Sequence, residues 1–255
     1  MAINASIQLI RNAALVINYA GKKILVDPML APKDAYDSFT GAARNPTVDL
    51  PLSVEEITKN VDLVLVTHTH RDHFDPAASQ ALDKSVKLIN QPADDAYFKN
   101  EGFVNAETVG ESTVWNGISI YRTGGEHGSG EVLKLMGTVS GFVLKAEGQP
   151  TIYIVGDSIW MPLVAQSIEQ FKPDYIVINS GGAIWPGYET TPILMEENQV
   201  MQLIKESGNA KIIAVHMEAL DHCRTTRASL RREANEFNVS ADKLIIPANG
   251  ETVML

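Results

Sequence analysis

One junction in the chain constrains its fold more than any other feature: metal-binding residue types directly follow an apolar run. Residues Val61–Val66 are almost wholly apolar, which predicts a strand buried on both faces. The hexapeptide HTHRDH follows at residues 68–73. Alternate side chains of an extended backbone project to the same side, so His68 and His70 can converge on one ion. A helical turn after them would direct Asp72 and His73 to a second position nearby.

The small number of histidines makes this cluster informative. The chain has 6 histidines among 255 residues, and 3 of them lie in this hexapeptide together with an aspartate. Imidazole and carboxylate ligands suit zinc, iron or manganese, and a strand end is a rigid mount for them. The segment therefore predicts a metal site rather than a chance grouping.

Charge and composition limit the partners that we expect. Hydrophobic residues make up 45% of the chain, enough for a sizeable core, and the formal net charge is −10. No basic stripe of the kind that binds nucleic acid is visible. The arginines at 224, 227, 231 and 232 have helical spacing and are interpreted as a solvated helix face. We expect a small-molecule substrate and no nucleic-acid partner.

The cysteine content and the apolar runs bear on location. Cys223 is the only cysteine, so no intramolecular disulfide can form, and a reducing compartment is the default. The opening residues predict a first strand rather than a signal peptide. No apolar run reaches the roughly 18 residues of a membrane span. These features predict a cytoplasmic protein without a membrane partner; a homo-oligomer remains open.

The order of predicted elements indicates the fold class. Strands at 7–10, 14–17 and 23–26 form an antiparallel start, and residues 30–53 suggest a long loop near a site. Strands and helices then alternate to a closing strand at Leu244–Ile246. This order predicts an α/β fold with two sheets packed together and helices outside. Without a linker or an obvious repeat, residues 1–255 are expected to form one domain.

Three further candidate ligands each follow a predicted strand. His127 lies in a glycine-rich loop after residues 118–122, Asp157 ends the run Ile154-Val155-Gly156, and His216 follows Ile212–Val215. Each position alone is a weak signal, because strand-end histidines and aspartates have common structural uses. Their order behind the hexapeptide is what makes them candidates.

Together these residues resemble the metallo-β-lactamase superfamily, whose signature is HxHxDH followed by distant His, Asp and His ligands. The resemblance implies an αββα sandwich of two mixed sheets packed face to face with helices outside. It also implies two divalent ions, zinc first with manganese or iron as alternatives. His68, His70 and His127 would hold one ion, Asp72, His73 and His216 the other, and Asp157 would bridge them.

The chemistry implied by the resemblance is two-metal hydrolysis. Two ions lower the pKa of a shared water and so produce a bridging hydroxide near neutral pH. Asp72 and Asp157 would be the catalytic carboxylates. Their two charges and the hydroxide leave +1 on the ions, which favours a small anionic substrate.

Several residues near the ligands have supporting or open roles. An early strand-end aspartate, here Asp27, commonly supports the histidine loop in this family, and a hydrogen bond to a ligand imidazole is expected. Trp185, Tyr188 and Glu189 in loop 181–192, together with His222, are candidate pocket residues. Cys223 comes too late in the chain for the cysteine ligand of antibiotic-hydrolysing relatives. It is interpreted as structural, which argues against β-lactam hydrolysis.

The opening segments at 9–13 and 21–28 resemble the branch that contains L-ascorbate-6-phosphate lactonase. A small lactone or ester is therefore the expected substrate. The alternatives are a phosphodiesterase or nuclease of the same fold, a di-iron redox protein, and a binding module without catalysis. Relatives with di-iron redox sites normally carry a glutamate where this chain has His70.

Overall fold

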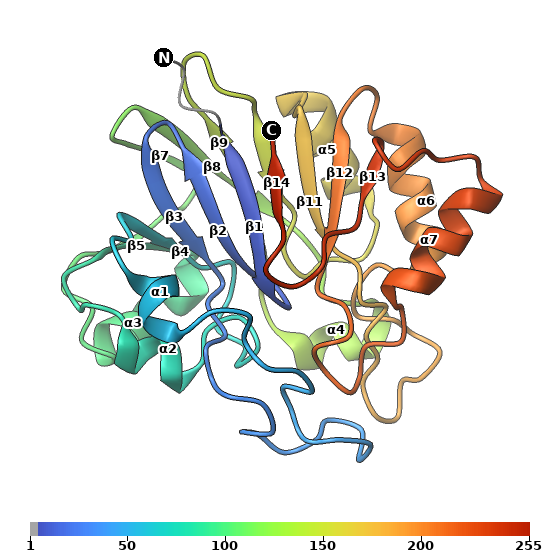
Figure 1. Cartoon of the computed structure of the whole chain (residues 1–255), viewed down its shortest axis with the longest axis horizontal. Helices are drawn as coiled ribbons and strands as arrows, with labels where there is room; N and C mark the ends of the chain where they lie inside the picture. Colours follow the sequence, from blue (N-terminus) through green and yellow to red (C-terminus); the bar gives the residue numbers. More distant parts are fainter. Residues whose placement is uncertain (1–4) are drawn as a thin grey trace.

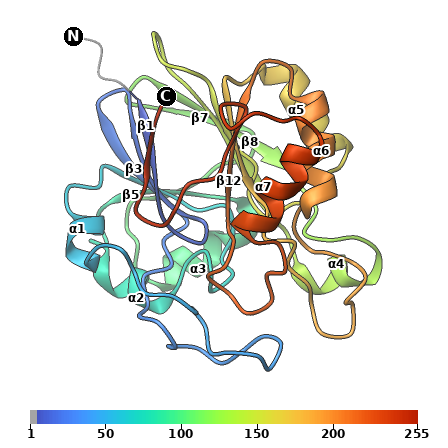
Figure 2. The same cartoon turned by 45° about the vertical axis from the view of Figure 1, so that its right-hand side comes forward.

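The chain folds into two seven-stranded sheets that pack face to face, with helices on the outer faces (Figures 1 and 2). A computed structural model describes residues 5–255. In the view of Figure 2, helices α1–α3 lie on the side of the first sheet and α5–α7 on the side of the second. This arrangement confirms the predicted α/β sandwich of two mixed sheets.

The first sheet begins antiparallel and becomes parallel. Its strands are β1 (Ser6–Arg11), β2 (Ala14–Tyr19), β3 (Lys22–Val26), β4 (Leu63–Leu65), β5 (Lys87–Asn90), β6 (Ala106–Thr108) and β14 (Thr252–Met254), in the order β14-β1-β2-β3-β4-β5-β6. Pairing is antiparallel from β14 to β3 and parallel from β3 to β6.

The second sheet repeats this plan. It contains β7 (Ser112–Trp115), β8 (Ile118–Gly124), β9 (Ser140–Lys145), β10 (Ile152–Ile154), β11 (Tyr175–Asn179), β12 (Lys211–Val215) and β13 (Leu244–Ile245), in the order β13-β12-β11-β10-β9-β8-β7. Pairing is antiparallel from β7 to β10 and parallel from β10 to β13.

Seven α-helices and one 3₁₀ helix connect the described strands. They are α1 (Val54–Thr58), α2 (Pro76–Ala81), η1 (Pro92–Asp94), α3 (Asp95–Asn100), α4 (Gly130–Met136), α5 (Pro162–Phe171), α6 (Glu197–Glu206) and α7 (Arg227–Glu236). Within residues 5–255, none of the helices has the length and apolarity needed to cross a bilayer.

The apolar runs become strands that are buried on both faces. In β4, Leu63 and Leu65 pack into the core between the sheets, whereas Val64 packs under α1–α3. In β12, Ile213 belongs to the core between the sheets and Ile212 to the layer under α5–α7. Successive side chains of a strand point to opposite faces, so only an unbroken apolar run serves two cores at once.

The final strand lies elsewhere than the sequence predicts. Leu244–Ile246 was expected to close the fold, but β13 covers only Leu244–Ile245, and the chain continues to β14, which pairs antiparallel with β1. The side chains of β14 are half-exposed or exposed, so this segment lacks the apolar pattern of a buried strand. Helices α1 and α4 and strands β6 and β7 were also not predicted, being short and weakly patterned.

Candidate metal centre

The hexapeptide at 68–73 leaves β4 in extended form and then turns sharply. The backbone N–H groups of His73 and Phe74 both donate to the carbonyl oxygen of His70, at 2.9 Å each. This turn brings Asp72 and His73 back beside the strand, as the residue types in the motif predict. Asn12 fixes the turn from the β1–β2 hairpin, since its Nδ2 donates to the Asp72 carbonyl oxygen at 3.1 Å.

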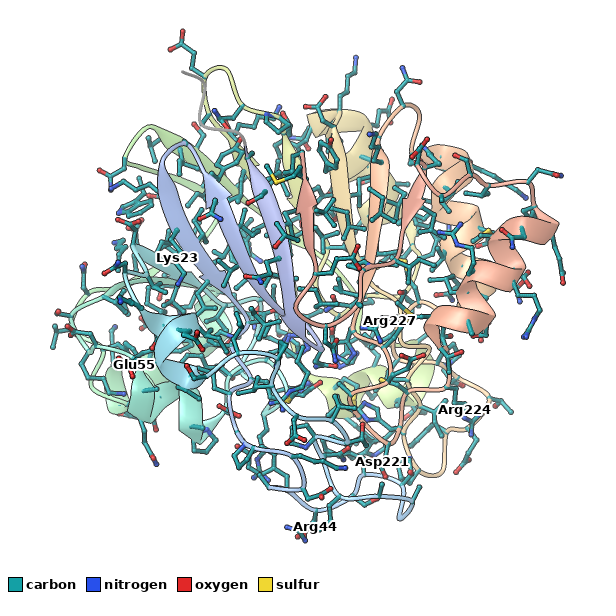
Figure 3. The ribbon with its side chains drawn as sticks, viewed as in Figure 1. Lys23, Arg44, Glu55, Asp221, Arg224 and Arg227 are labelled. Carbon is teal, nitrogen blue, oxygen red and sulfur yellow. The ribbon has the colours of Figure 1, made fainter. Side chains whose placement is uncertain are left out.

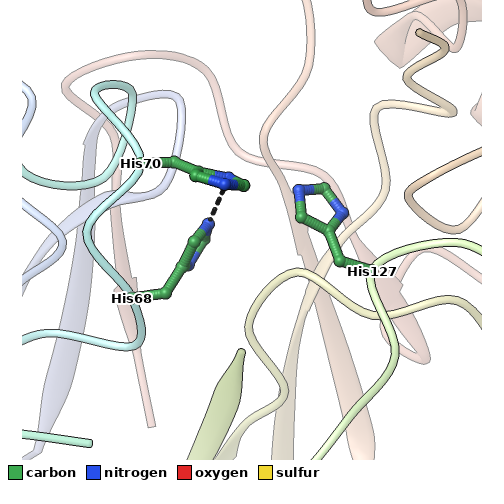
Figure 4. Close-up of side chains that lie close together, drawn as sticks. All are labelled: His68, His70 and His127. Atoms are coloured by element: carbon green, nitrogen blue, oxygen red, sulfur yellow. Dashed lines mark hydrogen bonds between the residues drawn. The ribbon is translucent and has the colours of Figure 1, made fainter. Parts of the chain in front are cut away.

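Three imidazoles form the first donor group. His68, His70 and His127 each offer a ring nitrogen, and these atoms all lie within 4.8 Å of one another. Figure 4 shows His68 and His70 facing His127 across a small gap. His68 Nε2 lies 2.9 Å from His70 Nδ1, and His127 Nδ1 lies 2.7 Å from the Ile193 carbonyl oxygen. The latter contact leaves His127 Nε2 free to face the group.

Two carboxylates and two imidazoles form the second donor group. Asp72, His73, Asp157 and His216 each contribute an atom within 4.8 Å of the others, and all four are buried. His216 Nε2 lies 3.1 Å from Asp72 Oδ2, and His73 Nε2 lies 3.7 Å from the same oxygen. The donors come from the hexapeptide and from the ends of β10 and β12.

Asp157 lies between the two groups. Its Oδ2 is 3.1 Å from His73 Nε2 and 3.3 Å from His127 Nε2, so one oxygen approaches a member of each group. Its Oδ1 accepts a hydrogen bond from Asn179 Nδ2 at 2.6 Å. The carboxylate is thus fixed in orientation by the neighbouring parallel strand, β11.

Asp27 supports the histidine loop from the end of β3. Its Oδ2 lies 2.8 Å from His73 Nδ1 and accepts from Thr67 Oγ1 at 2.7 Å, while its Oδ1 accepts from the Thr67 backbone N–H at 2.8 Å. A carboxylate on Nδ1 fixes the tautomer and orientation of an imidazole whose Nε2 is a ligand. The structure therefore places Asp27 where the sequence predicts.

The backbone accepts unfavourable conformations at this edge of the sheets. Asp27 and His216 have φ values of 43° and 64°, a region that costs a residue with a Cβ about 1–2 kcal/mol. Gly156, beside Asp157, has φ 73°, and a Cβ there would lie 2.5 Å from the Ser140 carbonyl oxygen. Strained backbone conformations of this kind concentrate at functional sites, where the required position of a side chain outweighs the conformational energy of the backbone.

The two carboxylates are anionic despite their burial. Burial alone would raise the pKa of Asp157, but His73, His216 and His127 outweigh it and hold the pKa well below its usual range. Burial likewise opposes ionisation of Asp72, and His73 and His216 hold that pKa well below its usual range.

The imidazoles divide into two classes. Burial lowers the pKa of His73, but Asp157, Asp27 and Asp72 outweigh it and raise the pKa to about 10. Burial likewise lowers the pKa of His216, but Asp157 and a hydrogen bond that His216 donates to Asp72 outweigh it and raise that pKa well above its usual value. Burial keeps the pKa of His68 and of His127 below the usual value.

The donor atoms are better placed to bind metal ions than to form hydrogen bonds with one another. His73 Nε2 is buried and makes no hydrogen bond of acceptable geometry, although Asp157 Oδ2 lies 3.1 Å away. Buried polar atoms are normally paired, so this nitrogen lacks a partner that a cation would supply. Imidazole nitrogens with carboxylate oxygens are the ligands of zinc and related divalent ions. The residues present therefore fit two such ions.

A cavity of about 340 Å³ opens on both donor groups. Four of its lining residues belong to the donor groups and are here called its floor: His70, Asp72, His127 and Asp157. Its wall is mainly aromatic and apolar, formed by Tyr36, Phe39, Leu135, Met136, Trp185 and Ile193, with Asp37, Arg71 and His222 as the remaining lining residues. The volume lies at the lower end of the range for small-molecule sites.

A comparison with protein-family models shows which family the chain belongs to. The model described as beta-lactamase superfamily domain matches residues 6–216. The chain belongs to the beta-lactamase superfamily. The match ends at His216, so it includes all seven candidate ligands.

Close relatives of this superfamily member cover nearly its whole length. The UPF0173 protein YddR of Bacillus subtilis (strain 168) is 39% identical over 249 residues, covering 95% of this chain and 97% of that protein. A structure from Veillonella parvula DSM 2008, described as "a possible metal-dependent hydrolase", has a TM-score of 0.94, 35% identity and coverage of 99% and 100%. This superfamily member is a metal-dependent hydrolase.

A second solved structure is also close. The isothiocyanate hydrolase from Delia radicum gut bacteria has a TM-score of 0.92 and 40% identity, covering 98% of this chain and 99% of that one. Its identity to this superfamily member is as high as that of the Bacillus relative.

The other predicted pocket residues are divided between the cavity and its surroundings. Trp185 and His222 line the cavity. Tyr188 was expected there but lies outside the lining and packs, together with Trp185 and Cys223, against the apolar cluster that contains Val132 and Ile193.

Glu189 and Cys223 also lie outside the lining of this cavity. Glu189 accepts from the Gly187 backbone N–H at 2.8 Å at the surface, as a turn residue. Cys223 Sγ lies 3.7 Å from His216 Nδ1, behind the candidate ligand.

Sequence reasoning missed two kinds of site residue. Asn179 ends the apolar strand β11 as Asp157 follows β10, so a search for polar residues at every parallel strand end would have found it. Tyr36 and Phe39 lie in the long loop before α1 without any periodic pattern. Only the loop's position before the motif indicated a site there.

Proposed function

We propose that this hydrolase holds two divalent ions and uses an activated water to attack an electrophilic carbon of a small substrate. His68, His70 and His127 would hold one ion and Asp72, His73 and His216 the other, with Asp157 between them. The observation that carries the proposal is the cavity whose floor belongs to both donor groups and whose wall is apolar.

Bound ions would supply a shared water whose lowered pKa makes it a bridging hydroxide near neutral pH, and a Lewis acid for the substrate. Zinc is proposed first, with manganese or iron as alternatives. Asp72 and Asp157 line the cavity and would be the catalytic carboxylates, which can accept a hydrogen bond from the attacking water and so orient it. Asn179 and Asp27 keep Asp157 and His73 in their orientations.

The apolar wall favours a substrate with an uncharged, hydrophobic group. An isothiocyanate, R–N=C=S, has such a group, and the relative of 40% identity is named an isothiocyanate hydrolase. Water oxygen would bond to the central carbon while the C=N π pair moves to nitrogen, which takes a proton. The resulting thiocarbamic acid splits into the amine R–NH₂ and carbonyl sulfide, so one water is consumed and all atoms balance.

The second candidate is a small anionic lactone or ester. The observation that favours it is Arg71, whose guanidinium belongs to the cavity lining and lies 4.9 Å from the centre of the Tyr36 ring. A cation in the cavity lining would attract a carboxylate or phosphate group. The opening segments, which resemble the lactonase-like branch, agree with this candidate. A long nucleic acid fits neither the cavity volume nor the net charge of −10.

A substrate screen on protein reconstituted separately with zinc, manganese and iron tests the proposal. Benzyl isothiocyanate, a neutral lactone and a matched anionic lactone are compared, with amine release and acid release as readouts. Turnover of the isothiocyanate with kcat/KM at least about 100-fold above either lactone supports the first candidate. Preference for the anionic lactone that weakens with salt supports the second. No turnover of any of the three with any metal overturns the proposal.

A further inference from the structure

His222 lines the cavity but belongs to neither group of metal donors. Its side chain comes from the segment after β12, and only 6% of the residue is exposed. A buried imidazole of this kind needs a hydrogen-bonding partner or a function that explains it.

No described residue satisfies the ring fully. The Nδ1 atom of His222 is buried and has no hydrogen-bond partner in the described part of the chain. The hydrogen bond recorded at this residue is a backbone one, in which the Ile184 N–H donates to the His222 carbonyl oxygen at 3.1 Å. The fold therefore holds the main chain of His222 in place, whereas no hydrogen bond from a described residue fixes its imidazole.

One aromatic ring packs against this imidazole, and a second packs against the first. The Phe39 and His222 rings meet edge to face, with centroids 4.6 Å apart and planes at 75°. The Trp185 ring also lies near Phe39, with centroids 6.1 Å apart and planes at 46°. The three rings come from three separate segments, and all three line the cavity.

Asp221, the neighbour of His222, holds Phe39 in this arrangement. Its carboxylate accepts from the Phe39 backbone N–H at 3.0 Å, from Thr40 Oγ1 at 2.8 Å and from Asn45 Nδ2 at 2.7 Å. Figure 3 shows Asp221 above the loop that carries Arg44, at the lower end of the molecule. One carboxylate thus ties the Phe39 loop to the segment of His222 before any substrate arrives.

We propose that Phe39, Trp185 and His222 form a substrate cage, in which the two aromatic rings bind a flat apolar group and His222 hydrogen-bonds a heteroatom of the reacting group. The cage deepens the proposed function and rests on it. For an isothiocyanate, the flat group is R and the heteroatom is the nitrogen or sulfur of N=C=S. The cage therefore selects aryl and arylalkyl isothiocyanates over those with a short alkyl group.

The charge state of the imidazole agrees with this role. Burial lowers the pKa of His222 to about 4, although Asp72 raises it, so the ring is neutral near pH 7. A neutral imidazole has one N–H donor and one acceptor nitrogen. It can donate to nitrogen or sulfur without placing another positive charge beside the ions that the two donor groups would hold.

Binding of benzyl azide provides a test that does not depend on turnover. This compound has a linear three-atom group like that of benzyl isothiocyanate but offers no carbon for hydrolysis. Calorimetric dissociation constants are measured for the wild type, His222→Phe, His222→Gln and the control Phe237→Ala, an exposed aromatic outside the cavity. His222→Phe should weaken binding about tenfold, whereas His222→Gln, which keeps a donor, and Phe237→Ala should stay within about threefold. Thermal stability and metal content of each variant establish that it is folded.

Selectivity supplies the second readout. The ratio of kcat/KM for benzyl over methyl isothiocyanate should fall about tenfold in Phe39→Ala and in Trp185→Ala, through a higher KM for the benzyl compound. Unchanged azide affinity in His222→Phe, or unchanged selectivity in both aromatic variants, overturns the cage.

The two proposals fail in different ways. If the wild type hydrolyses isothiocyanates but the variants bind and select like it, the cage is wrong and the activity stands. If the wild type hydrolyses none but binds benzyl azide through His222, the cage is supported and the reaction is wrong. Absence of azide binding by the metal-loaded wild type overturns the cage.

Discussion

Asn179 fixes Asp157 across two parallel strands: the amide Nδ2 at the end of β11 donates to Oδ1 of the carboxylate after β10, at 2.6 Å. The other oxygen, Oδ2, faces His73 and His127. The two oxygens of Asp157 are therefore inequivalent, and the one that lies between the donor groups cannot rotate away without breaking a buried hydrogen bond.

Replacing Asn179 should loosen this carboxylate. Asn179→Ala is expected to lower metal affinity or kcat by about 10- to 100-fold, since partners that orient metal ligands have effects of this size. Metal titration and steady-state kinetics measure both quantities. Asn18→Ala is the matched control, because Asn18 Nδ2 donates to Ser6 Oγ within the first sheet. Wild-type metal affinity and kcat in Asn179→Ala would show that the hydrogen bond has no such role.

The positions of the candidate ligands could be predicted because strand ends meet at one edge of a sheet. β4 and β12 are apolar runs buried on both faces, which sequence alone identifies, and the histidines follow directly. Asp27 could be placed by the same logic, as the last residue before a proline stops β3. Local pattern suffices for such residues, since the strand itself carries them to the site.

The wall of the cavity could not be predicted in the same way. Phe39 and Asp221 are 182 residues apart, and their contact is a backbone-to-side-chain hydrogen bond within irregular segments. Neither segment has a period that would reveal which side chains face the site. The edge strand β14 was missed for a related reason, since a half-exposed strand shows no apolar run.

Asp27→Asn should impair the second donor group. An asparagine keeps the size of the side chain, but it carries no negative charge to face His73 Nδ1. It also has a single acceptor oxygen, so it cannot serve both His73 and the Thr67 backbone N–H as the two Asp27 oxygens do. Metal affinity is expected to fall about 10- to 100-fold. Equilibrium dialysis with zinc measures this affinity. The control is Asp62→Asn, because Asp62 forms an ion pair with Lys22 and belongs to neither donor group. Equal zinc affinity in the two variants would contradict a supporting role for Asp27.

Asp72→Ala should leave one ion per chain instead of two. The first donor group consists of His68, His70 and His127 and does not include Asp72, whereas the second loses one of its two carboxylates. Elemental analysis after reconstitution is expected to give close to two ions for the wild type and close to one for the variant, with most turnover lost. Two ions in Asp72→Ala, or near zero in the wild type, would refute the division into two groups.

A substitution in the core between the sheets should destabilise the whole fold. Leu144 is fully buried in β9 among residues of both sheets, so Leu144→Ala removes apolar contacts and leaves a cavity. The expected loss is about 2–5 kcal/mol of unfolding free energy. Val114→Ala, at a side chain that is 71% exposed in β7, should cost about 0.5 kcal/mol or less. Urea unfolding compares them, and similar midpoints for the two variants would contradict a shared core.

Lowering the pH should release the loop that Asp221 holds. Burial would raise the pKa of Asp221, but hydrogen bonds from Ser38, Asn45 and Thr40 outweigh it and keep the pKa below its usual range. A carboxyl group with a depressed folded-state pKa stabilises the protein above its unfolded-state pKa of about 3.9 and loses that contribution as pH falls further.

The variant Asp221→Asn isolates this contribution. It should be less stable than the wild type by about 2 kcal/mol at pH 7, the size expected for hydrogen bonds to a charged group. Because other carboxyl groups also titrate below pH 4, the measured quantity is the difference between the two proteins in thermal unfolding from pH 7 to pH 3. That difference should stay constant down to about pH 4 and shrink below it. A difference that grows on acidification would have the wrong sign for a carboxylate latch, and one that is absent at pH 7 would show that the loop is held by other contacts.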